Sequence, residues 1–84
     1  MSSQDLHAEK LVRLVVKRLA EARIAQGMSK NRLAVLAGID PKAVAFIEKG
    51  ERSPTLHTLA KMARALDLSL GFMVTEVEND LGST

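Results

Sequence analysis

Apolar residues recur every three or four positions along most of the chain, and this spacing is typical of amphipathic helices. The first such segment runs from Leu6 to Gln26, carries charged residues on its other faces, and is followed by Gly27. The sequence therefore predicts one long first helix, after a flexible N-terminus over residues 1–7. The apolar positions of this helix are Leu11, Leu14, Val15, Leu19 and Ala22.

Three shorter helices are predicted over residues 29–37, 41–49 and 55–66, because each has its own start and stop signals. Each follows a residue or run that favours an N-cap, and Asp40-Pro41 is the strongest of these. The Asp side chain can accept from free amides, and a proline at the first helical position gives up an N–H that had no partner. The other signals are Ser29, Gly38, Gly50 and the run Ser53-Pro54-Thr55.

The C-terminal segment has a different pattern, because residues 68–77 are rich in β-favouring side chains and alternate between two faces. This alternation predicts a strand over residues 69–78, followed by a disordered acidic tail over residues 79–84. A single strand has no partner within a helical chain, so we expect it to pair with a second copy. The expected dimerisation residues are Leu70, Phe72, Met73, Val74 and Val77. The rival interpretation is a fifth helix, to which Gly71 is the main obstacle.

Charge is distributed unevenly along the chain. Residues 1–66 hold all 12 basic residues and six acidic ones, a net charge of +6, whereas residues 67–84 hold four acidic residues and no basic one. A basic body is a feature of proteins that bind nucleic acid. There is no cysteine, no apolar run long enough to span a bilayer, and no signal-peptide pattern in the polar N-terminal residues, so we expect a cytoplasmic protein.

The sequence contains no arrangement that favours catalysis or metal binding. His7 and His57 are far apart, with no second ligand at a suitable spacing, and no glycine-rich phosphate loop is present. We expect neither an enzyme nor a cofactor nor a metal site.

The stretch from Lys30 to Gly50 has the spacing of two short helices that pack closely across a tight turn. Such packing requires a small residue where the helices touch, which is Ala34, and a residue that tolerates positive φ in the turn, which is Gly38. It also requires two apolar residues one helical turn apart on the second helix, which are Val44 and Ile47. This pattern predicts a helix-turn-helix, the second helix of which enters the major groove of DNA.

Residues 14–70 resemble the Cro and phage-repressor type of helix-turn-helix protein, also called the XRE family. The resemblance implies an all-α bundle of four to five helices, with the DNA-binding domain here over residues 8–68. The predicted strand departs from that pattern and is more similar to the HipB-like antitoxin branch, in which a strand pairs across the dimer. The matching residues are Leu19, Arg23, Gly27–Lys30, Leu33, Ala34, Ala37–Ile39, Val44, Ile47, Glu48, Gly50, Ser53–Leu56, Leu59, Ala63 and Leu66.

In this family the start of the third helix faces the DNA bases, and its outward residues here are poor in hydrogen-bonding groups. Phe46 has two open interpretations: a DNA contact, or an apolar contact with the loop at Arg52 and Ser53. The base-reading candidates are Pro41, Lys42, Ala43 and Phe46. The phosphate-binding candidates are Lys30, Asn31, Lys49, Arg52, Ser53 and Thr55. The resemblance also implies a structural ion pair between Arg23 and Glu48.

We therefore expect a sequence-specific regulator of transcription that binds double-stranded DNA at a palindromic operator as a homodimer, acting as a repressor. One alternative is an antitoxin that regulates its own operon and binds a partner toxin protein. A second alternative is a protein-interaction module that no longer binds DNA; the basic residues Lys30, Lys42 and Lys49 argue against it.

Overall fold

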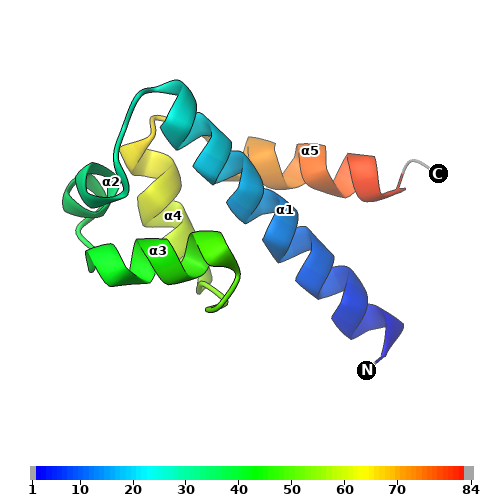
Figure 1. Ribbon diagram of the computed structural model, residues 1–84. Helices are drawn as coiled ribbons and strands as arrows, with labels where there is room; N and C mark the ends of the chain where they lie inside the picture. Colours follow the sequence, from blue (N-terminus) through cyan, green and yellow to red (C-terminus); the bar gives the residue numbers. More distant parts are fainter. Residues whose placement is uncertain (1, 83–84) are drawn as a thin grey trace.

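The computed structural model describes residues 2–82, and within that range the chain forms five α-helices and no strand (Figure 1). Helices α2, α3 and α4 form a compact group at one end of α1, and α5 packs on α1 and α4. The N-terminal half of α1 projects beyond this group. The helices are α1 (Ser3–Ala25), α2 (Lys30–Ala37), α3 (Pro41–Lys49), α4 (Leu56–Ala65) and α5 (Leu70–Gly82).

Helix α1 starts earlier than the sequence analysis indicated, because Ser2 and Asp5 form a capping box. The Ser2 hydroxyl accepts from the Asp5 amide at 3.1 Å, and the Asp5 carboxylate accepts from the Ser2 amide at 3.4 Å. The segment expected to be flexible is thus helical from Ser3, while Met1 lies outside the described residues. This pairing satisfies amides that would otherwise have no partner at the helix start.

The ends of α2 and α3 lie where the sequence predicted them. The Ser29 hydroxyl accepts from the Arg32 amide at 3.0 Å, and the Asp40 carboxylate accepts from the Lys42 amide at 2.8 Å. Gly38 and Gly50 follow the two helices with φ angles of 69° and 79°, in the left-handed region that side chains other than glycine rarely adopt. Local chemistry therefore fixes the length of both helices.

A single aliphatic core joins all five helices. Leu19 of α1, Leu33 of α2, Val44 of α3 and Met62 of α4 are fully buried at its centre. Burial of one such side chain stabilises the fold by about 1.5–3 kcal/mol, so convergence of the four helices on one point compensates for the small size of the domain.

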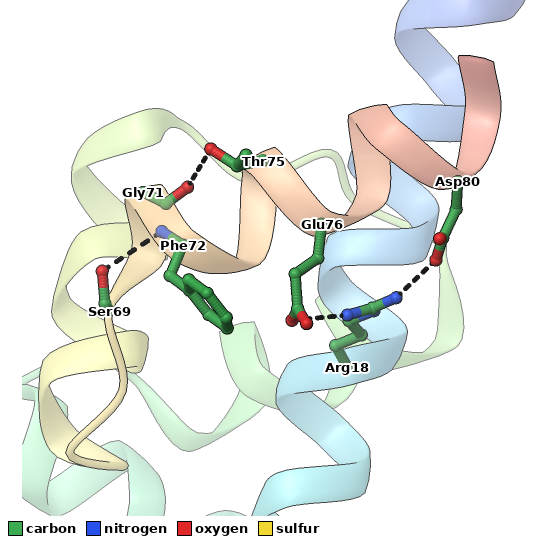
Figure 2. Close-up of polar contacts among 7 residues, drawn as sticks. All are labelled: Arg18, Ser69, Gly71, Phe72, Thr75, Glu76 and Asp80. Atoms are coloured by element: carbon green, nitrogen blue, oxygen red, sulfur yellow. Dashed lines mark hydrogen bonds and ion pairs between the residues drawn. The ribbon is translucent and has the colours of Figure 1, made fainter. Parts of the chain in front are cut away.

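The predicted strand over residues 69–78 is wrong, because this segment is the first part of α5. Helix α4 ends without a glycine: Asp67 takes the left-handed position at a φ of 58°, and the Leu68 amide donates to the Ala63 carbonyl at 2.8 Å. The Ser69 hydroxyl then caps the new helix by accepting from the Phe72 amide at 3.1 Å (Figure 2). A new helix therefore starts only a few residues after α4 ends.

Two sets of contacts hold α5 in place. Its inner face follows the helical period, with Met73 and Val77 buried in the core. On the flank, the Arg18 guanidinium of α1 donates to Glu76 at 2.8 Å and to Asp80 at 2.7 Å (Figure 2). These ion pairs are partly exposed and worth about 0–1 kcal/mol each, so they orient α5 while the core contacts hold it. The tail expected to be disordered over residues 79–84 is helical to Gly82, and its last two residues lie outside the described residues.

Candidate nucleic-acid interface

Helices α2 and α3 form the predicted helix-turn-helix. Ala34 of α2 and Val44 of α3 have no exposed surface, and Ile47 is 2% exposed, so the inner faces of the two helices are in close contact with the core. The turn is closed by a hydrogen bond of 3.0 Å from the Ile39 amide to the Ala34 carbonyl. This arrangement leaves one long face of α3 exposed.

The exposed face of α3 carries Lys42, Phe46 and Lys49, which follow one another at one-turn intervals. Pro41 is also exposed at the start of the helix, whereas Ala43 is half-buried. The structure therefore places the four base-reading candidates at the N-terminal and central turns of one helix. Lys42 is the charged donor at the N-terminal end of this face and Lys49 the one at its C-terminal end, with apolar side chains between them.

Phe46 makes the loop contact that the sequence analysis left open as one of two interpretations. The guanidinium carbon of Arg52 lies 5.3 Å from the centre of the Phe46 ring, the distance of a cation–π contact. The chain can fold back in this way because the Glu51 and Arg52 amides both donate to the Phe46 carbonyl, at 2.9 and 3.3 Å. The ring is still 38% exposed, so Phe46 also remains accessible on the outer face.

The phosphate-binding candidates lie at two helix starts and along the turn between α3 and α4. Lys30 and Asn31 form the first residues of α2, and Thr55 caps α4 by accepting from the Thr58 amide at 3.1 Å. The first amides of a helix have no partner within it and attract anions, so both starts suit phosphate binding. Lys49 is exposed at the end of α3, and Arg52 and Ser53 are exposed in the turn between α3 and α4.

The ion pair between Arg23 and Glu48 is present and links α1 to the last turn of α3. Arg23 donates through Nε and Nη2 to the two carboxylate oxygens, at 2.8 and 2.9 Å, and through Nη1 to the Met28 carbonyl at 2.8 Å. The side chains are only 11% and 7% exposed. Hydrogen bonding to Glu48 raises the pKa of the Arg23 guanidinium, against the opposing effect of burial. The Arg23 guanidinium therefore stays charged, and its two hydrogen bonds to Glu48 fix the direction of α3.

The five residues expected to mediate dimerisation have different places in the structure. Met73 and Val77 are buried in the core of their own chain, and Leu70 and Val74 pack partly against it. Phe72 alone of the five is exposed, at 63%, on the face of α5 that turns away from the core. Three polar residues that position the helices had no role in the sequence analysis: Arg18, Gln26 and Asp67. The side-chain amide of Gln26 donates to the Leu66 carbonyl at 2.9 Å.

No helix within residues 2–82 combines the length and apolar character that a membrane span requires. In the same range no three His, Cys, Asp or Glu side chains are grouped so that they could hold a metal ion.

Comparison with known proteins gives a consistent result. Residues 19–73 match the helix-turn-helix family profile. The HTH-type transcriptional regulator PuuR of Escherichia coli is 40% identical over 62 residues, which are 74% of this chain and 34% of PuuR, so the chain spans about one third of that relative. An uncharacterized HTH-type transcriptional regulator of Haemophilus influenzae is 30% identical over 93% of this chain and 80% of its own length.

A solved structure agrees with these sequence relatives. The restriction-modification controller protein C.AhdI from Aeromonas hydrophila superposes with a TM-score of 0.67 and 38% identity, over 75% of this chain and 94% of the controller protein. The helical arrangement and the sequence matches thus point to the same group of proteins. The chain belongs to the helix-turn-helix family of DNA-binding transcriptional regulators.

Proposed function

We propose that this protein represses transcription from the cytoplasm by binding a palindromic operator as a homodimer, with α3 in the major groove. The observation that carries the proposal is the exposed face of α3, on which Lys42 is a charged hydrogen-bond donor, between two helix starts that can hold phosphates. Lys42 would donate to guanine, and the Phe46 ring would contact the groove beside it. Because this face has few hydrogen-bond donors, we expect DNA shape to contribute a large part of the sequence specificity.

The homodimer is proposed to form through the outer face of α5, around Phe72. A dimer that reads two half-sites must leave both copies of α3 free, and α5 packs on α1 and α4 rather than on α3. Exposed aromatic side chains are favoured anchors of protein interfaces, and Phe72 is 63% exposed. The contact would place the half-sites about 34–36 Å apart, one turn of DNA.

The antitoxin alternative has lost the feature that favoured it. Its similarity to the HipB-like branch depended on a C-terminal strand, and residues 70–82 are helical. A toxin partner stays a prediction, whereas the repressor proposal depends on α3 and does not need the strand.

Selection of bound duplexes from a random library tests the proposal and should return a two-fold symmetric site. On that site, Lys42→Ala should weaken binding by about 1–3 kcal/mol, and on random DNA by much less, because a lost guanine contact affects only the correct sequence. The matched control is Lys49→Ala in the same helix, which should weaken both duplexes alike. Equal effects of Lys42→Ala on the two duplexes would assign Lys42 to phosphate.

Binding should also depend steeply on salt. Three of the phosphate-binding candidates are cations, Lys30, Lys49 and Arg52, which makes six in the homodimer. Affinity should therefore fall by about 1,000-fold or more between about 50 and 200 mM salt, because cations that neutralise phosphates release counterions from the DNA. Fluorescence anisotropy with a labelled duplex of the selected site measures this. An affinity that stays constant over that range, or a failure to bind any duplex, would contradict the proposed function.

A further inference from the structure

A groove lies between residues 8–20 of α1 and the wall made by the last turn of α3 and the turn that follows it. Its volume is about 610 Å³. Arg13 and Lys17 lie on the α1 side, and Lys49, Arg52 and Ser53 lie on the side of the turn. More than 30 positions separate Lys17 from Lys49 along the chain, and the fold brings the two sets to the same groove.

The positive charge in this groove exceeds the negative charge, with four cations against two carboxylates. Only two acidic residues line it, Glu9 and Glu48, and both carboxylate oxygens of Glu48 accept from Arg23. Arg13, Lys17 and Lys49 form no ion pair or hydrogen bond among residues 2–82, and the guanidinium of Arg52 contacts only the Phe46 ring. Four cations around one groove repel each other, and an anionic ligand between them would remove that repulsion.

The exposed lining of the groove is more apolar than polar, but four of its six charged residues are cations. Val16 and Ile47 line it but are only 6% and 2% exposed, because they belong to the core. The other apolar residues on the walls are small or half-buried. The apolar lining is thus spread over small or partly buried side chains, and the cations on the two walls are the groups that a polyanion would contact.

The groove continues the candidate DNA interface. The two surfaces share Lys49, Arg52 and Ser53. On α1, Lys10 lies one turn before Arg13 and extends the basic face along the part of the helix that projects from the domain (Figure 1). At about 1.5 Å per residue, the helix from Lys10 to Lys17 covers about 10 Å. A basic face of this length can contact more than one phosphate of the same strand, since each nucleotide carries one.

We propose that Arg13 and Lys17, with Lys49 and Arg52 opposite them, bind the sugar-phosphate backbone that flanks the half-site read by α3. This proposal rests on the proposed function, since it extends the footprint of the same DNA-binding face. Contacts with this flanking DNA add affinity that does not depend on base sequence. Affinity should therefore depend on how far the duplex extends beyond the operator.

The variants Arg13→Gln and Lys17→Gln test the proposal on the selected duplex, prepared with long flanks and also trimmed to its two half-sites. Glutamine keeps the helix propensity and removes one charge from each protomer. On the long duplex the slope of log affinity against log salt should become less steep by about 2 for each variant, because the homodimer loses two phosphate contacts. On the trimmed duplex the variants and the unmodified protein should bind with the same affinity.

The matched control is Arg64→Gln, which removes the same charge from an exposed site in the last turn of α4. Its salt slope should equal that of the unmodified protein on both duplexes, and circular dichroism checks that every variant is folded. If Arg13→Gln and Lys17→Gln behave like Arg64→Gln, the flank proposal is wrong while the proposed function stands. If the unmodified protein binds no duplex, the proposed function itself fails.

Discussion

Phe72→Glu should give a folded monomer that binds the selected operator about 100- to 10,000-fold more weakly than the unmodified protein. The side chain is 63% exposed and lies outside the core of its own chain, so the fold should survive the substitution. Two glutamates that face each other across the two-fold axis would repel. Each half-site would then be bound independently, and the gain from linking two binding events would be lost.

Sedimentation and operator affinity, measured on the same samples, check this prediction. The matched control is Ile24→Glu, which adds the same charge at a side chain that is 65% exposed near the end of α1. This control should remain dimeric and keep most of its affinity. A dimeric Phe72→Glu variant, or one that binds as tightly as Ile24→Glu, would show that the dimer forms elsewhere.

A point substitution is a better test of the dimer than removal of the C-terminal segment. Truncation after Leu68 would delete Met73 and Val77, which are 6% and 1% exposed and belong to the core of the same chain. Loss of operator binding by a truncated protein would therefore report unfolding as well as dissociation.

Arg23→Met should lower the free energy of unfolding by about 3–5 kcal/mol, because it leaves the carboxylate of Glu48 buried without its cation. For a domain of this size that loss lowers Tm by more than about 12 °C. The substitution also removes the donor to the Met28 carbonyl, so it should cost more than Glu48→Met. Thermal denaturation followed by circular dichroism measures both variants.

Two further variants separate the charge effect from a loss of packing. In the double variant Arg23→Met/Glu48→Met no charge is left unpaired, so it should be more stable than Arg23→Met alone. Arg18→Met changes the same residue type in the same helix, but its side chain is 33% exposed and its partners are more so, and it should cost less than about 1 kcal/mol. Equal losses for Arg23→Met and Arg18→Met would contradict the structural role of the buried pair.

The first four helices could be predicted because their ends are set by local chemistry. Asp40, Gly38 and Gly50 act within a few residues of their position, and the sequence is sufficient to locate them. The same kind of signal was present at Ser2 and Asp5 but was overlooked, since the residues that follow show little apolar periodicity.

The fifth helix was missed because two patterns overlap in its sequence. Leu70, Phe72 and Val74 alternate as in a strand, while Leu70, Met73 and Val77 have the helical spacing that the structure uses. Only packing against α1 and α4 decides between them. In addition, the left-handed residue after α4 is Asp67 rather than a glycine, so the usual signal for the end of a helix is missing, although Ser69 offers an ordinary N-cap for α5.

Only part of the candidate site could be predicted from the sequence. The family resemblance was enough to place Arg23 opposite Glu48 and to assign the outer face of α3. Whether the basic residues of α1 lie beside the DNA-binding face depends on how α1 packs relative to the turn after α3. No local sequence pattern contains that information. Arg13 and Lys17 are therefore indistinguishable in the sequence from any solvent-exposed charged face.

The way in which α3 is held has a consequence for the evolution of DNA specificity. The helix is fixed by its caps, Asp40 and Gly50, and by the buried side chains Val44 and Ile47, none of which lies on its outer face. Exchange of Lys42 or of Phe46 leaves these anchors intact. Duplicated copies of such a gene could therefore acquire new operators by a few substitutions on one face, while selection for a stable fold acts on a separate set of residues.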